Sequence, residues 1–122
     1  MVGASEPEKA AEFWKNMGLV AKVYPKLSRG GAIETDMKVK EEIFGCKYKR
    51  ESEWCHILSS GDVVLCCMDW YREHILGNVN DNTLSQIWNS ESYLTIREKI
   101  RHSTNKSFIC NKCEWGLPYT KQ

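Results

Sequence analysis

The pattern of hydrophobic and polar positions predicts one helix close to the N-terminus. Apolar residues recur three to four positions apart in the segment EPEKAAEFWKNM, which is the spacing of a helix with one apolar face. Ser5 precedes this segment as a candidate N-cap, and Glu8 follows three positions later as in a capping box. Gly18 is a natural residue for the end of such a helix.

The next residues predict a strand and then a polar connector. Residues 19–27 alternate partly between apolar and polar side chains, which favours a short strand. Residues 28–42 are polar and contain glycines, as loops do. One helix and one strand cannot bury a core between them. We therefore expect residues 1–30 to be the edge of something larger, joined by a connector, residues 31–44, to a second unit over residues 45–122.

The second unit reads as short strands followed by helices. Two β-prone runs, SEWCHIL and DVVLCCM, are joined by SSG, which predicts a hairpin with Gly61 in its turn. We expect residues 72–82 to form an irregular loop. Thr83, with Gln86 three positions later, predicts the start of a short helix, and the segment ESYLTIREKIRH predicts a second one. This order of elements indicates an α+β fold.

Composition and charge exclude some classes of partner. The chain has 122 residues, with 17 Lys and Arg against 16 Asp and Glu, so it lacks the charge excess typical of proteins that bind nucleic acid or anionic lipid. No apolar run approaches the ~20 residues of a membrane span, and the N-terminal residues do not resemble a signal peptide. We expect a cytoplasmic protein without nucleic-acid or membrane partners.

Cysteine is the outlying residue type. The chain has six: Cys46, Cys55, Cys66, Cys67, Cys110 and Cys113. In a reducing compartment, such a group favours a metal site over disulfides or reduced core thiols. Cys110 and Cys113 form a Cys-x-x-Cys knuckle, whose two sulfurs can face one metal ion or one cluster edge. A redox-active pair would be expected to open a helix after a strand, whereas this knuckle follows a helix and a loop.

Cys66 and Cys67 are adjacent, and adjacent cysteines can hardly form a disulfide with each other. Successive side chains of a strand point to opposite faces. We therefore expect only one of the two to face the site. The other is expected to be buried as a small hydrophobic residue, which is the common environment of a free cysteine.

Four cysteines share a spacing that includes the residues between them. Cys46 is followed by fourteen residues and then Gly61, and four further residues lead to Cys66. A long segment with predicted helices then leads to the knuckle. That segment contains LGNV and LSQIWNSESY, followed by Arg97. Together these residues, roughly 45–115, resemble the auxiliary iron–sulfur domain of radical S-adenosylmethionine enzymes. The resemblance is to its short, one-cluster form, the twitch domain, which is related to the SPASM domain.

The resemblance implies a twitch-like fold, in which a β-hairpin and two short helices surround a four-cysteine site. It implies that this site binds a [4Fe–4S] cluster. It also implies that residues 1–30 are the last helix and strand of a partial α/β barrel. Cys55 lies too close to Gly61 for the family's spacing, and Cys67 comes one position late. The ligands implied by the resemblance, hereafter the four predicted ligands, are Cys46, Cys66, Cys110 and Cys113.

The resemblance also implies a function. The domain would transfer electrons or position a substrate beside the barrel of an enzyme that modifies a peptide or a small molecule. That barrel, in the same or a separate chain, and its substrate would be the partners. The chain lacks the Cys-x-x-x-Cys-x-x-Cys spacing that radical chemistry requires, so we do not expect the isolated chain to be catalytic. The alternative is a structural zinc module that serves interaction, because zinc also accepts four cysteines.

Several residues near the cysteines have simpler interpretations. Asp69 and Asn78 are expected to fix their loop through hydrogen bonds from side chain to backbone. Neither His56 nor His74 is expected to bind metal where four cysteines match. Three tryptophans lie near predicted ligands in the sequence, and we expect ordinary core aromatics rather than a dedicated shield against water: Trp54, Trp70 and Trp115.

Overall fold

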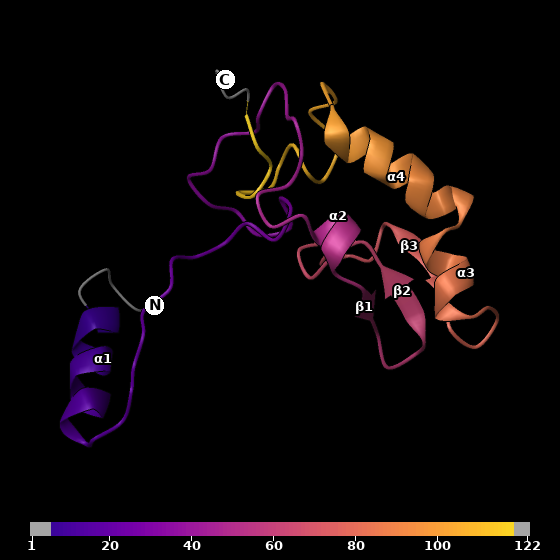
Figure 1. Cartoon of the computed structure of the whole chain (residues 1–122). Helices are drawn as coiled ribbons and strands as arrows, with labels where there is room; N and C mark the ends of the chain where they lie inside the picture. The colour runs from indigo at the N-terminus through magenta and orange to yellow at the C-terminus, as the bar shows by residue number, and fades with distance from the viewer. Residues whose placement is uncertain (1–5, 119–122) are drawn as a thin grey trace.

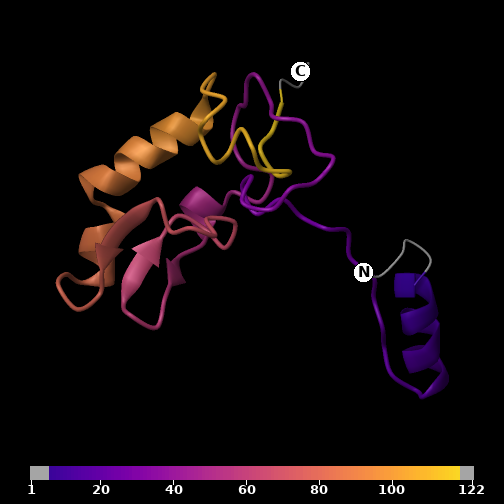
Figure 2. The same cartoon turned by 180° about the vertical axis from the view of Figure 1, so that it is seen from behind.

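The structure is a computed structural model that describes residues 6–118. Within that range it has four helices and one three-stranded antiparallel sheet (Figure 1). The sheet and the last two helices form one body, and the first helix stands apart from it in both views (Figures 1 and 2). In chain order the elements are α1 (Glu6–Asn16), α2 (Arg50–Glu53), β1 (His56–Ile57), β2 (Asp62–Val64), β3 (Ile75–Asn78), α3 (Leu84–Trp88) and α4 (Glu91–Arg101).

The predicted N-terminal helix is confirmed as α1. Its C-terminal end is a Schellman motif, because the Gly18 N–H donates to the Lys15 carbonyl at 2.9 Å and the Leu19 N–H donates to the Trp14 carbonyl at 3.1 Å. Gly18 has a φ of +81°, which a glycine adopts without steric cost. The expected N-cap, Ser5, lies outside the described residues. None of the residues of α1 is buried.

The strand expected over residues 19–27 is wrong. The segment is extended but carries no strand in the structure, and it includes the exposed side chains of Val20 and Tyr24. A strand needs a neighbour to satisfy its backbone N–H and C=O groups, and the three paired strands of the described chain all lie after residue 55. Alternating side chains alone therefore did not decide the backbone structure here.

The predicted hairpin is confirmed as β1 and β2. The strands pair antiparallel, with Ile57 opposite Val63. The turn closes through a hydrogen bond of 2.8 Å from the Gly61 N–H to the Leu58 carbonyl. Gly61 has a φ of +90°, in the region that favours glycine.

A third strand, β3, forms where we expected only an irregular loop, so that part of the prediction is wrong. It pairs antiparallel with β2, with Val63 opposite Gly77, and the register shifts between Val63 and Val64. The loop that returns the chain to β2 is fixed by Asp69, whose buried carboxylate accepts from the N–H groups of Glu73 at 3.0 Å and His74 at 2.8 Å.

Both predicted loop-fixing residues make the expected contacts. Besides the two bonds of Asp69, the Asn78 amide donates to the Asp62 carboxylate at 3.0 Å and accepts from the Asn80 N–H at 2.8 Å. These bonds tie the turn after β3 to the start of β2. The hairpin and β3 are thereby held as one sheet.

The two predicted helices are confirmed as α3 and α4. α3 begins with a complete capping box, in which Thr83 and Gln86 each accept from the other's backbone N–H. α4 begins at an N-cap serine, Ser90, whose hydroxyl oxygen accepts from the Tyr93 N–H. Within residues 6–118 no helix is both long and apolar enough to cross a membrane.

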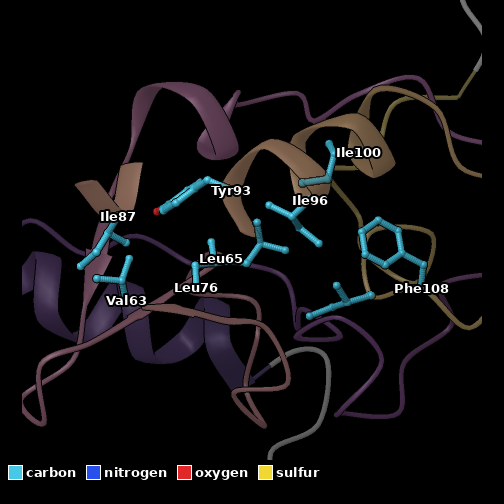
Figure 3. Close-up of a cluster of buried hydrophobic side chains, with 9 residues drawn as sticks. Val63, Leu65, Leu76, Ile87, Tyr93, Ile96, Ile100 and Phe108 are labelled. Carbon is cyan, nitrogen blue, oxygen red and sulfur yellow. The ribbon is translucent and has the colours of Figure 1, made fainter. Parts of the chain in front are cut away.

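The hydrophobic core lies between the sheet and the two helices. α4 contributes Tyr93, Ile96 and Ile100 from one face, as its helical spacing requires (Figure 3). The short helix α2, which the sequence did not predict, packs against α4. The remaining buried members of the core are Val63, Leu65, Leu76, Ile87, Phe108 and Ile109.

Substitution on the buried face of α4 should destabilise the fold strongly. Ile100 is 2% exposed, so Ile100→Ala should lower the free energy of unfolding by about 2–5 kcal/mol through lost burial and a residual cavity. Leu94 on the same helix is 56% exposed, so Leu94→Ala should cost about 0.5 kcal/mol or less. Urea unfolding of both variants measures the difference. Equal losses would contradict the orientation of α4 described above.

Candidate metal centre

Backbone pairing brings the first predicted ligand beside the last two. Cys46 forms an isolated antiparallel bridge with Gly116, and the Lys47 N–H donates to the Trp115 carbonyl at 2.8 Å. A Cβ atom at Gly116 would overlap the carbonyl oxygen of Cys110. The close approach of these segments therefore requires a glycine at this position.

The other predicted ligands reach the same region from separate elements. Cys66 follows the end of β2 and packs against the core, as Cys46 and Cys110 also do. Cys110 and Cys113 are part of a series of turns after α4, in which the Cys113 N–H donates to the Cys110 carbonyl at 3.4 Å. Cys113 is buried, and the other three are half-buried.

The electrostatics of the thiols show that the four predicted ligands are neighbours. Burial raises the pKa of the Cys110 thiol, and the charges of Cys66, Cys113 and Cys46 raise it further. Burial also raises the pKa of Cys66 to about 11, and Cys113 adds to that effect. The pKa of Cys113 is raised by burial too, with a smaller contribution from Cys46.

Backbone N–H groups point at two of the sulfurs. The Met68 N–H donates to Cys66 Sγ at 3.4 Å, and the Trp115 N–H donates to Cys113 Sγ at 3.5 Å. Hydrogen bonds of this kind favour the thiolate, and they tune metal centres held by cysteine. They oppose the effect of burial on the pKa of each thiol.

The remaining two cysteines have different environments. Cys67 is exposed, so the expectation that it would be a buried hydrophobic residue is wrong. β2 ends at Val64 and the chain turns at Cys67, so the alternation of a strand does not extend to this residue. Cys55 is half-buried against the core and accepts a hydrogen bond from the Tyr93 hydroxyl at 3.9 Å.

The residues present fit a centre held by thiolates. Four cysteines from three separate segments lie near one another, and two have N–H donors on sulfur, which is the donor set of an iron–sulfur cluster. Within residues 6–118, no three Cys, His, Asp or Glu side chains converge as the ligands of a single ion would. The assignment of the four predicted ligands stays a prediction.

The tryptophans differ from expectation. Trp54 and Trp70 are 58% and 59% exposed, so the expectation of core aromatics is wrong for both. Both lie in turns or connecting segments, where the backbone carries their side chains away from the core. Trp115 is half-buried and packs edge to face against Tyr48, with ring centroids 5.0 Å apart.

A groove of about 460 Å³ opens beside one predicted ligand. Cys66 lies on its wall together with the exposed Cys67 and Trp70, and Arg72 provides a positive charge.

The environments of the two histidines are described by burial, charge and ring packing. The pKa of His56, which also lines the groove, is lowered by burial and then by Arg50, and His74 packs edge to face on Phe108.

No pattern in the sequence predicted the contacts between residues 28–40 and the knuckle. The Ser28 N–H donates to Glu114 Oε1 at 2.6 Å, and the Ser28 hydroxyl lies 3.0 Å from Glu114 Oε2. Lys40 reaches the carbonyls of Cys113 and Glu114. Figures 1 and 2 show this segment and the C-terminal segment side by side. Polar residues in a predicted connector reveal no particular partner.

The family comparison agrees with the cysteine spacing. A family model for the SPASM iron–sulfur cluster-binding domain matches residues 46–114. A curated relative, the S-adenosyl-L-methionine-dependent 2-deoxy-scyllo-inosamine dehydrogenase of Niallia circulans, is 22% identical over 87 residues. That match covers 70% of this chain and 34% of the relative, so the chain spans about a third of the relative's length. No solved structure matches the chain.

Alanine substitution tests the ligand assignment. Cys46→Ala, Cys66→Ala, Cys110→Ala and Cys113→Ala should each abolish retention of iron, because each removes one of four thiolates from the centre. Cys55→Ala and Cys67→Ala are the matched controls and should retain most of it. Iron per chain after anaerobic purification is the measurement. Normal iron content in Cys46→Ala, together with loss of iron in Cys55→Ala, would show that Cys55 rather than Cys46 is the ligand.

The metal-free chain should show a clear order of thiol reactivity. Cys67 is exposed and should be alkylated by iodoacetamide first at pH 8. Cys110 should react last, because burial and neighbouring thiols raise its pKa and leave it protonated at that pH. Peptide mapping by mass spectrometry reads the order, with urea-unfolded chain as the control in which the six thiols react alike. Faster labelling of Cys110 than of Cys67 would contradict the described burial.

Proposed function

This chain belongs to the SPASM family of iron–sulfur cluster-binding domains, and we propose that it binds one [4Fe–4S] cluster as the auxiliary domain of a radical S-adenosylmethionine enzyme. The observation that carries the proposal is the convergence of three segments that are far apart in the sequence. Cys46 is bridged to Gly116 beside the knuckle, and Cys66 and the knuckle cysteines act on each other's thiol pKa. Cys46, Cys66, Cys110 and Cys113 would hold the cluster as thiolates.

The chain's own residues would prepare this site in two ways. The N–H groups of Met68 and Trp115 stabilise negative charge on Cys66 and Cys113. The core residues, against which Cys46, Cys66 and Cys110 pack, would limit the access of water to the sulfurs. A bound cluster supplies a centre that accepts and donates single electrons. Ligation by four cysteines leaves no open iron position, which favours electron transfer or substrate positioning over Lewis-acid chemistry.

The groove beside Cys66 supports a role in electron transfer or substrate positioning. It places an exposed aromatic side chain, Trp70, and a positively charged one, Arg72, on the solvent side of a predicted ligand. An electron acceptor or a substrate that entered the groove would approach the centre at Cys66. A cluster buried on all sides would have no such route.

The parent reaction is also a proposal. We infer an enzyme that modifies a peptide or a small molecule in the cytoplasm, with a radical S-adenosylmethionine barrel as the partner in the same or a separate chain. The relative from Niallia circulans is named as a dehydrogenase of 2-deoxy-scyllo-inosamine, and this supports the small-molecule alternative. The exposed residues of α1 and of residues 19–24 support the proposal that residues 1–30 are the end of such a barrel.

Metal and acid-labile sulfide analysis of anaerobically purified chain tests the proposal. We expect about four irons and about four sulfides per chain, with a brown colour from charge transfer between sulfur and iron. Cys113→Ala, which removes one knuckle sulfur, is the control and should lose both elements together. About one zinc per chain without sulfide, under the same anaerobic conditions, would reject the cluster in favour of a structural zinc module.

A further inference from the structure

Lys40 is held against the Cys-x-x-Cys knuckle through its backbone. The Lys40 N–H donates to the Asn111 carbonyl at 2.9 Å, and the Asn111 side-chain amide donates back to the Lys40 carbonyl at 3.1 Å. Asn111 lies between the two knuckle cysteines and is fully buried. Its amide also donates to the Ser103 carbonyl at 3.1 Å. Lys40 precedes the residues matched by the SPASM family model, which begin at residue 46.

The side chain of Lys40 extends from this fixed point to the end of the knuckle. Its Nζ lies 2.7 Å from the carbonyl oxygen of Cys113 and 3.2 Å from that of Glu114. Its positive charge acts on the Cys113 thiol, lowering a pKa that burial raises. An ammonium group bound to two carbonyls and half-buried has fewer available positions than a surface lysine. The charge is therefore fixed in place beside a predicted ligand.

Glu114 carries a charge of the opposite sign that acts on the same groups: in addition to burial, it raises the pKa of Cys113 by more than Lys40 lowers it, and it favours the charged form of Lys40 against burial. The Glu114 carboxylate is turned toward Ser28, which supplies donors to both of its oxygens. The charge of Glu51 acts on Cys110, whose pKa it raises in addition to burial. Lys40 contacts the carbonyl of Glu114 rather than its carboxylate.

A cluster held by four thiolates carries net negative charge, and the addition of one electron makes it more negative. A fixed positive charge close to the ligands stabilises the reduced form more than the oxidised form. We infer that Lys40 is a positioning residue that holds a positive charge against the knuckle and thereby raises the reduction potential of the centre. This inference rests on the proposed cluster binding.

Redox titration of the iron-loaded chain, followed by electron paramagnetic resonance, tests the inference. Lys40→Met removes the charge and the donor at nearly constant volume. We expect the equilibrium constant for one-electron reduction to fall about tenfold, which corresponds to about 59 mV toward lower potential. Lys40→Arg keeps the charge and should stay close to the original potential. Lys38→Met is the matched control, because Lys38 is exposed two positions earlier and should give no shift.

Lys40→Gln separates charge from hydrogen bonding, because its amide donates without carrying a charge. A potential as low as that of Lys40→Met supports an effect of charge. An unchanged potential in the neutral variants, or an equal shift in Lys38→Met, would overturn the inference. If the neutral variants lose iron but Lys40→Arg retains it, the site needs the positive charge, and the inference is supported. If Lys40→Arg loses iron as well, Lys40 has a purely structural role, and the inference is overturned. Failure of the unsubstituted chain to bind iron would instead reject the proposed function.

Discussion

The antiparallel pairing of residues 43–47 with the C-terminal segment is the constraint on which the site depends. The Ile43 and Ser103 backbones exchange hydrogen bonds of 2.9 and 3.1 Å, and further bonds join the Phe44 N–H to the Leu117 carbonyl and the Leu117 N–H to the Gly45 carbonyl. Two predicted ligands that are 64 positions apart, Cys46 and Cys110, become neighbours through this pairing. The core next to it fixes Cys66 from the side of the sheet. Without the pairing, the knuckle would have no fixed relation to the other sulfurs.

Local signals in the sequence predicted local structure well. The hairpin, the two later helices and their caps depend on residues within a few positions of each other, such as Thr83 with Gln86 and Gly61 in its turn. The third strand was missed because the segment that forms it also contains the turn-forming residues Gly77 and Asn78. Its pairing joins residues such as Val63 and Gly77 across a loop that Asp69 closes, and a pairing of this range leaves no periodic pattern.

The cysteines show the same division between local and non-local information. The resemblance to a family implied four predicted ligands, and the pKa shifts of Cys66, Cys110 and Cys113 indicate that these thiols lie near one another and near Cys46. Periodicity failed at Cys67, because it assumed that a strand continued past the point where the chain turns. The contacts of Ser28 and Lys40 with the knuckle had no sequence signal at all. They join residues more than 70 positions apart, and only the folded backbone brings them together.

Metal binding and folding are coupled in a site of this construction. Buried thiols with raised pKa values carry protons in the metal-free chain at neutral pH, and ligation requires that these protons leave. The N–H groups on Cys66 and Cys113 and the ammonium of Lys40 favour the charged state that burial opposes. These groups come from the loop after β2, the knuckle and the connector, so the donors are complete only when all three segments are assembled. The same contacts that shape the fold therefore set how readily the site accepts negative charge.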